Sequence, residues 1–280
     1  MNQVRLYDLA FHAFGKIIPS RKGVKKAIKR GSVLVDGVPG DSGWKIKSGQ
    51  RLDLLADYSK IPKIYELDIP VLYEDDQVAV VNKPAGIVVS GNEYRTLYNA
   101  LGFNLLRSTA KDALPYPTPC HRLDKATSGC LLIAKTKTAQ IDIGNELTHK
   151  EVQNEYLALI HGEMSESGYI DLLVNEQTAE TSFERLEKIV TQRAEIWSLV
   201  KTSPHTGRTH QLRIHFSAIG HPILGDKLYG SEGNVLRHKG LFLCARSVTF
   251  HIGGQIKTAT VDTPKKFSRV IRLVSPKRNP

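Results

Sequence analysis

The pattern of apolar and polar positions between residues 71 and 251 indicates a mixed α and β domain. The stretch VLYEDDQVAVVNKPAGIVV, residues 71–89, alternates two strand-like runs with acidic and Lys-Pro-Ala-Gly turns. Further strand-like runs occupy residues 129–135, 153–160, 195–201 and 241–251, and helical candidates lie near residues 137–148 and 208–219. In the second helix, Leu212, Phe216 and Ile219 share a face, and Gly220 and Pro222 end it.

The first 55 residues predict two helices followed by a small hairpin sheet. Ser20 caps a helix that buries Val24, Ala27 and Ile28, and Gly31 ends it. A strand-like run follows, and Asp36-Gly37 is typical of a tight hairpin turn. Residues 58–68 have no sustained period, so we expect one domain over residues 1–57, a linker at 58–68 and a second domain over 69–280.

Positive charge is concentrated at the start of the chain. Residues 1–30 hold eight Lys and Arg against Asp8, a net charge of +7 out of the total of +11. Arg21, Lys25 and Lys29 recur at four-residue spacing, which suits contact with successive phosphates, although a merely solvated basic face gives the same pattern. The run SRKGVKKAIKRGSVLVDG resembles the αL RNA-binding module of ribosomal protein S-four. The resemblance implies that the basic residues of this helix bind RNA, namely Arg21, Lys22, Lys25 and Lys29.

Composition narrows the class of protein. The 280 residues are 41% hydrophobic and 24% charged, which is typical of globular chains, and no apolar run approaches the length of a membrane span. No leader pattern is visible at the start, so we expect a cytoplasmic protein. Cys120, Cys130 and Cys244 form no C-x-x-C pair, so we expect reduced core residues, no disulfide framework and no metal site.

Two segments concentrate chemically active side chains. HRLDKATSG, residues 121–129, places polar groups directly before an apolar strand, where scaffolds often present reactive groups. Read alone, Asp124 between Arg122 and Lys125 is most simply a paired surface carboxylate. The second segment, residues 203–230, contains four histidines whose spacing matches no common zinc signature. No phosphate-binding glycine loop occurs, which disfavours a nucleotide cofactor.

Together the two segments resemble the RluA-type RNA pseudouridine synthases, which isomerise uridine to pseudouridine within RNA. Further matching motifs are NKPAG at residues 82–86, EYLALIHG at 155–162, TGRTHQLRIH at 206–215 and GHPILGD at 220–226. The resemblance implies that Asp124 acts on the sugar carbon, that Arg213 pairs with Asp124, and that Tyr156 stacks on the uracil and assists proton removal from carbon 5. Arg122 matches the arginine that helps to extrude the base.

The resemblance also sets expectations for fold and partners. It implies an α+β catalytic domain with a mixed, largely antiparallel sheet and flanking helices, no cofactor, and a monomer that binds RNA and no membrane. Large-subunit ribosomal RNA is favoured over transfer RNA as substrate. A non-catalytic RNA-binding or ribosome-assembly factor is the alternative, and a zinc deaminase lacks its ligands. Asn154, Ala126 and Cys244 depart from the family pattern, and the basic C-terminal end either adds RNA contacts or caps the domain.

Overall fold

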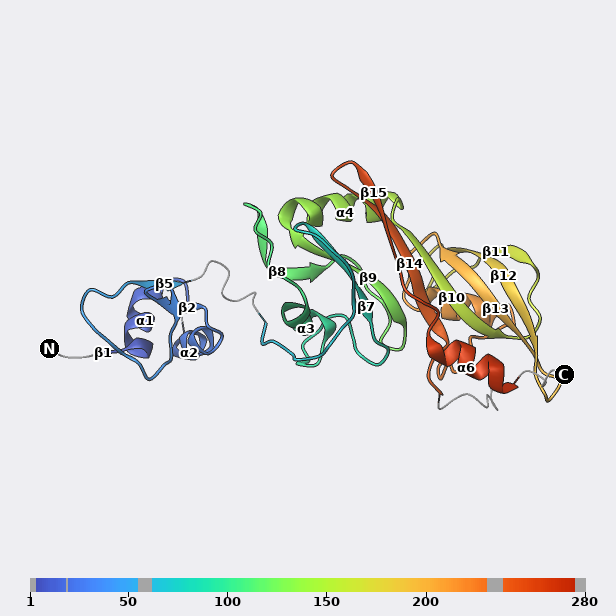
Figure 1. Ribbon diagram of the computed structural model, residues 1–280, viewed down its shortest axis with the longest axis horizontal. Coiled ribbons are helices and arrows are strands. Elements are labelled where there is room, and N and C mark those ends of the chain that lie inside the picture. Colours follow the sequence, from blue (N-terminus) through green and yellow to red (C-terminus); the bar gives the residue numbers. More distant parts are fainter. Residues whose placement is uncertain (1–3, 19, 55–61, 231–238, 275–280) are drawn as a thin grey trace. The chain divides into compact units, whose positions relative to one another are not determined.

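The chain forms two compact units. The computed structural model describes residues 4–18, 20–54, 62–230 and 239–274 (Figure 1). The units are Met1–Ile64 and Tyr65–Pro280, so the division falls within the predicted linker 58–68, of which residues 58–61 lie outside the described part. In the described part of the chain no helix is long and apolar enough to cross a membrane.

The first unit packs two helices and short strands around a small core. Its described elements are β1 (Val4–Arg5), α1 (Leu6–Phe14), α2 (Arg21–Lys29), β2 (Val33–Val35), β3 (Val38–Pro39), β4 (Lys45–Ile46) and β5 (Leu52–Leu54). β2 pairs with both β3 and β5, which extends the expected hairpin to three strands. Asp36 and Gly37 have φ values of 52° and 82°, as a tight hairpin turn of this kind requires.

Helix α2 begins and ends where its sequence predicts. The Ser20 hydroxyl accepts a hydrogen bond from the Gly23 backbone N–H at 3.0 Å, and Gly31 follows the helix with a φ of +72°. The predicted apolar face is buried. A Cβ atom on Gly23 would lie 2.7 Å from the Ile18 side chain, so the glycine allows the close approach of the preceding segment despite its low helix propensity.

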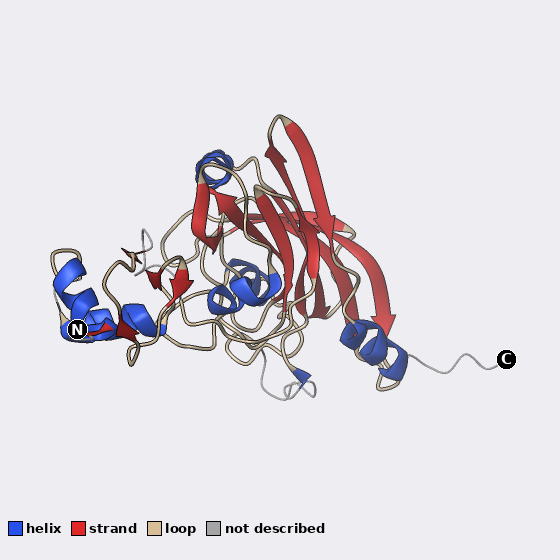
Figure 2. Ribbon diagram, turned by 60° about the vertical axis from the view of Figure 1, so that its left-hand side comes forward, coloured by secondary structure: helices blue, strands red, loops and turns tan. Residues whose placement is uncertain are grey.

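The second unit is built on a ten-stranded, largely antiparallel sheet (Figure 2). The strand order is β11-β12-β13-β10-β14-β9-β7-β6, while β15 pairs with β14 and β8 with β9. The strands are β6 (Val71–Glu74), β7 (Val78–Lys83), β8 (Ala113–Pro119), β9 (Ser128–Thr136), β10 (Gln153–His161), β11 (Ser167–Asp171), β12 (Glu180–Val190), β13 (Ile196–Pro204), β14 (Leu243–Ile252) and β15 (Gln255–Thr260). The α+β class with a mixed, largely antiparallel sheet is thereby confirmed.

Among the described residues, four helices accompany this sheet: α3 (Leu97–Asn104), α4 (Lys137–His149), α5 (Gln211–Ala218) and α6 (Lys265–Val274). Helix α5 begins at Gln211, so the helix predicted from residue 208 is too long at its start. His210 has a φ of 58°, and the Gln211 side chain accepts hydrogen bonds from Thr206 and from the Arg208 N–H. This arrangement holds residues 206–210 as a loop.

Helix α6 packs on the sheet through its apolar side chains. Phe267 and Val270 bury α6 against the sheet, which favours capping of the domain by this helix.

A close contact between β9 and β14 fixes the centre of the sheet. These strands run parallel for two residue pairs, Cys244 with Ser128 and Ala245 with Gly129. Gly129 has a φ of +118°, and a Cβ atom there would lie 2.1 Å from the Ala245 carbonyl oxygen. Glycine at residue 129 is therefore required both by the backbone angle and by the neighbouring strand.

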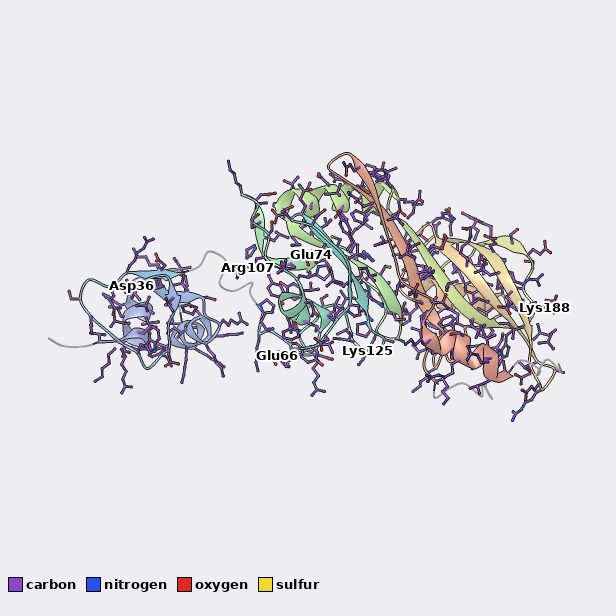
Figure 3. The ribbon with its side chains drawn as sticks, viewed as in Figure 1. Asp36, Glu66, Glu74, Arg107, Lys125 and Lys188 are labelled. Atoms are coloured by element: carbon purple, nitrogen blue, oxygen red, sulfur yellow. The ribbon has the colours of Figure 1, made fainter. Side chains whose placement is uncertain are left out.

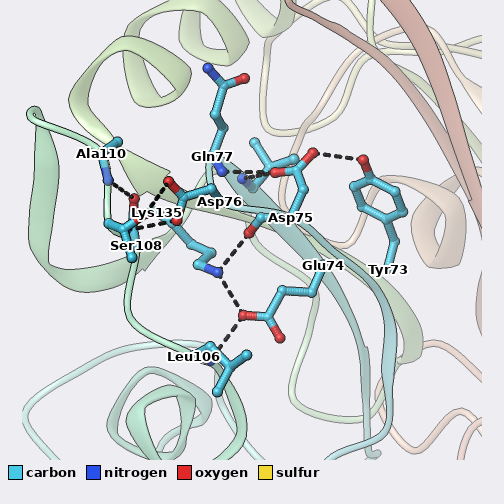
Figure 4. A network of polar contacts seen from close by, with 11 residues as sticks. Tyr73, Glu74, Asp75, Asp76, Gln77, Leu106, Ser108, Ala110 and Lys135 are labelled. Atoms are coloured by element: carbon cyan, nitrogen blue, oxygen red, sulfur yellow. Dashed lines mark hydrogen bonds and ion pairs between the residues drawn. The ribbon is translucent and has the colours of Figure 1, made fainter.

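A polar network lies at the edge of this sheet, where β6 ends (Figure 4). The buried Lys135 ammonium donates to the Glu74 carboxylate at 2.7 Å and to the Asp75 carbonyl at 2.6 Å. Glu74 also accepts from the Leu106 N–H, and Asp76 accepts from Thr109. These contacts tie the loop after α3 to strands β6 and β9, and we assign them a structural role.

Candidate active site

Asp124 lies in the loop between β8 and β9, at the side of a cavity of about 100 Å³. Its side chain is 16% exposed. The cavity is also lined by Arg122, Tyr156, His210 and Arg213. The structure thus brings four of the predicted site residues together: Asp124, Tyr156, Arg213 and Arg122.

The nearest positive charge to Asp124 is supplied by helix α5. Arg213 Nη1 lies 3.6 Å from Asp124 Oδ2, and the arginine side chain is only 7% exposed. His210 Nε2 lies 3.8 Å from the other carboxylate oxygen, while its Nδ1 is 3.0 Å from the Tyr229 hydroxyl. The predicted pairing of Arg213 with Asp124 is therefore present, at a distance longer than a direct hydrogen bond.

The shorter contacts of Arg213 are made with Asp226. Arg213 Nε and Nη2 donate to the two carboxylate oxygens at 2.7 and 2.8 Å, a bidentate pair. Burial alone would raise the pKa of Asp226, but hydrogen bonds from Arg213 and from the N–H groups of Leu228 and Tyr229 outweigh it and lower the pKa. Sequence reasoning did not single out Asp226, although it ends the GHPILGD motif.

Tyr156 enters the cavity from strand β10. The pairing of β10 with β14 shifts register between Glu155 and Tyr156, an irregularity that re-aims side chains next to functional sites. Burial, together with the negative charge of Asp124, raises the pKa of Tyr156 above its ordinary value. The phenol therefore keeps its proton at neutral pH.

Lys83 holds the loop that carries Asp124. Its fully buried ammonium donates to the carbonyls of Pro84 and Thr127 at 3.0 and 2.7 Å, and it reaches that of Lys125 at 3.5 Å. Burial lowers the pKa of Lys83 to about 8, although the charge of Asp124 opposes this. The side chain of Lys125 itself is exposed (Figure 3).

His121 ties the start of the same loop to β9. Its Nε2 accepts a hydrogen bond from the Leu132 N–H at 3.1 Å. Burial lowers the pKa of His121 to about 4, so the imidazole is neutral at pH 7 and keeps the lone pair that accepts this bond. Both Lys83 and His121 therefore position the loop that carries Asp124.

A larger groove of about 930 Å³ adjoins the cavity beside Asp124. The two share several lining residues, including Arg122, Tyr156 and Arg208. Exposed cations on the groove are Arg122, Lys150 and Arg208. Asn154 also lines it, and its Oδ1 atom is buried without a hydrogen-bond partner in the described residues.

The remaining predicted binding residues lie in the first unit, on α2. Arg21, Lys22, Lys25 and Lys29 are exposed. Arg21 is also engaged locally, since its guanidinium lies 3.6 Å from Asp8 and 4.9 Å from the centre of the Phe11 ring. Lys22, Lys25 and Lys29 are therefore better placed than Arg21 to contact a ligand.

Metal-ligand geometry is lacking from the described residues, in which no group of three or more His, Cys, Asp or Glu side chains could hold a metal ion. The three cysteines are free thiols, and Cys130 and Cys244 are buried.

A carboxylate beside a buried arginine and a tyrosine, next to a groove with exposed cations, suits an enzyme that acts on a polyanionic substrate. Residues 77–218 match the family model described as RNA pseudouridylate synthase. The chain belongs to the RNA pseudouridylate synthase family, which confirms the expectation of an RNA pseudouridine synthase.

Relatives support this assignment over most of the chain. Ribosomal large subunit pseudouridine synthase D of Nitrosomonas europaea is 32% identical over 240 residues, covering 78% of this chain and 67% of that protein. An uncharacterized RNA pseudouridine synthase of Aquifex aeolicus is 31% identical over 278 residues, covering 90% and 88%. The structure of human RNA pseudouridylate synthase domain containing 1 matches with a TM-score of 0.58 and 22% identity, over 75% of this chain and 97% of that one, and shows the same fold.

Proposed function

We propose that the chain converts uridine to pseudouridine with Asp124 as the nucleophile. In this isomerisation the bond from C1′ to N1 of uracil breaks, the base turns, and a bond from C1′ to C5 forms. The proton on C5 passes to solvent water and N1 takes up a proton from water, so the protons balance and no redox partner is needed. The observation that carries the proposal is the position of Asp124, 3.6 Å from the buried Arg213 and in one cavity with Tyr156.

Each neighbouring residue has a distinct part in this proposal. Arg213 orients Asp124 and balances its charge. Tyr156 stacks on the uracil, and its protonated phenol donates a hydrogen bond to the base. This assignment differs from the expected help in proton removal, because a phenol with a raised pKa is a poor base at neutral pH. Arg122, exposed at the mouth of the cavity, braces the strand after the base is extruded.

Large-subunit ribosomal RNA is the substrate that we propose. One observation supports it over transfer RNA: relatives in several bacteria are named as ribosomal large subunit pseudouridine synthases. We further propose that residues 1–57 form an RNA-binding domain of the αL type, joined by the linker 58–68 to the catalytic domain 69–280. In this arrangement Lys22, Lys25 and Lys29 contact phosphates.

Tritium release tests the mechanism. Ribosomal RNA transcribed with uracil labelled at carbon 5 is incubated with the full chain and with Asp124→Asn, which keeps the size of the side chain but removes its negative charge. We expect release from the unmutated chain and a loss of at least about 10³-fold in the variant, as when a catalytic nucleophile is removed. Asp142→Asn, on the exposed side of α4, is the matched control and should keep full activity.

Two results would contradict the proposal. Full activity of Asp124→Asn would remove the aspartate mechanism. Absence of release by the unmutated chain from ribosomal RNA, transfer RNA and partly assembled ribosomal particles would favour the alternative, a non-catalytic RNA-binding or ribosome-assembly factor.

A further inference from the structure

Tyr169 and His205 form an exposed aromatic pair outside the catalytic cavity. Tyr169 lies on β11, an edge strand of the sheet, and is 57% exposed. His205 directly follows β13 and is also exposed. The two rings are stacked, with centroids 5.8 Å apart and planes inclined by 30°. Because both rings are exposed, this pair presents π surface to solvent.

The sheet register places Tyr169 next to the groove, on the same face of the sheet as residues that line it. Tyr169 lies directly opposite Ser182 on β12, and Ser182 lies opposite Ser203 on β13. Directly opposite residues share a face of a sheet, and both serines line the groove of about 930 Å³. His205 lines it too, with Nε2 at 3.0 Å from the Ser182 hydroxyl. The aromatic pair therefore extends the groove that starts at Tyr156.

The charges around the groove indicate where the phosphates and where the bases of a bound RNA would lie. Arg122 and Arg208 line both the groove and the cavity, and suit a sugar-phosphate backbone. Beside Tyr169, in contrast, lie Asp171 and Glu180, whose negative charges act on its hydroxyl. Acidic groups repel phosphate, so the aromatic end of the groove suits an uncharged planar group.

We propose that Tyr169 and His205 form a stacking platform for an unpaired nucleobase of the substrate RNA, close along the strand to the uridine that enters the cavity. Single-stranded RNA is commonly bound by stacking its bases on aromatic side chains, and such stacking tolerates any base. The inference rests on the proposed function, since it places the strand by the uridine bound beside Asp124. In this proposal the platform holds the RNA strand while the target base is flipped out.

Binding of oligouridylate of about 12 nucleotides by the full chain tests the platform directly. Tyr169→Leu keeps a side chain that β-strands accept but removes the aromatic ring, whereas Tyr169→Phe keeps the ring. We expect Tyr169→Leu to weaken binding by about 5- to 100-fold and Tyr169→Phe to bind like the unmutated chain. Leu186→Ala, an exposed position on β12 that does not line the groove, is the control and should not change the Kd.

An abasic strand of the same length separates stacking from phosphate binding. It keeps the phosphates and lacks the bases, so Tyr169→Leu should leave its affinity unchanged. The slope of log affinity against log salt should also be the same in all variants, because no charge is removed. On ribosomal RNA we expect KM to rise in Tyr169→Leu while kcat stays constant.

Three results would overturn the platform: an unchanged Kd of Tyr169→Leu for oligouridylate, an equal loss on the abasic strand, or failure of Tyr169→Phe to restore binding. The proposed function fails by a different result, the absence of tritium release by the unmutated chain. The oligouridylate measurement needs no turnover, so the two failures are distinguishable.

Discussion

Arg213 is shared between two carboxylates that the sequence places 102 residues apart. It binds Asp226 through two short hydrogen bonds and faces Asp124 at 3.6 Å through its remaining nitrogen. Because Asp226 fixes the plane of the guanidinium, it sets the direction in which the third nitrogen points. Asp226 is accordingly a positioning residue for Asp124, although it is not itself in contact with the reacting atoms.

Asp226→Asn tests this role. Loss of one partner of a buried ion pair should lower the free energy of unfolding by about 3 kcal/mol at pH 7. Misplacement of Arg213 should lower kcat by about 10²-fold, more than it raises KM. Urea denaturation and tritium release measure the two effects, with Asp142→Asn as the unaffected control. A normal kcat in a folded variant would remove Asp226 from the catalytic arrangement.

The same variant carries a pH signature. Since the folded state lowers the pKa of Asp226, the carboxylate stabilises the fold above its unfolded pKa, and this stabilisation is lost as the pH falls through the folded pKa. The difference in unfolding free energy between the unmutated chain and Asp226→Asn should therefore be full at pH 7 and shrink below a pH of about 4. A difference that stays constant with pH would show that the charge of Asp226 is unimportant.

At the scale of elements, local signals were predictable and long-range ones were not. The Ser20 cap, the turn at Asp36-Gly37 and the helix end at Gly220 depend on neighbours in the sequence, and each is present. Strand β12 was missed because its register shifts between Arg185 and Glu187, which breaks the alternation of buried and exposed positions.

The contacts of Arg213 show the same division between local and long-range information. Family motifs pointed to Asp124, Tyr156 and Arg213, but nothing in the spacing shows that the chain after α5 turns back to place Asp226 against Arg213. Likewise, the stacking of Tyr169 on His205 depends on the alignment of β11 with β12 and β13. Such contacts come from tertiary structure, which overrides local preference.

Replacement of glycine by alanine should change the free energy of unfolding in opposite directions at two positions. Gly129→Ala places a methyl group against the Ala245 carbonyl at an unfavourable φ, so we expect a loss of at least about 3 kcal/mol of unfolding free energy. Gly144→Ala lies in α4 with no heavy atom within 4 Å of the new Cβ, and should gain up to about 1 kcal/mol from helix propensity. Urea unfolding of both variants measures the contrast. Equal stabilities would contradict the close approach of β9 and β14.

At the scale of the whole molecule, RNA affinity is expected to come from both units. The first unit contributes exposed cations on α2, and the second contributes the groove beside Asp124. Phosphate contacts supply affinity and position, whereas the cavity and groove act on the base. Substitutions in α2 should therefore change KM and leave kcat unaltered.

The triple variant Lys22→Gln, Lys25→Gln, Lys29→Gln measures the contribution of α2. If each lysine contacts a phosphate, the slope of log affinity for ribosomal RNA against log salt should fall by about 2. The control, Lys16→Gln, Lys45→Gln, Lys47→Gln, removes the same charge from exposed positions elsewhere in the first unit. Equal slopes in the two triple variants would show that the three lysines of α2 form a solvated basic face and do not contact phosphates.

The parallel contact between β9 and β14 also has a consequence for how the enzyme matures. The hydrogen bond from Cys130 to the Arg246 carbonyl joins residues 116 positions apart, and long-range pairing of this kind forms late in folding. A chain that emerges at about 5–20 residues per second exposes Asp124 seconds before Ala245 is available to close the sheet beside it. The sheet beside Asp124 therefore cannot close until β14 has left the ribosome.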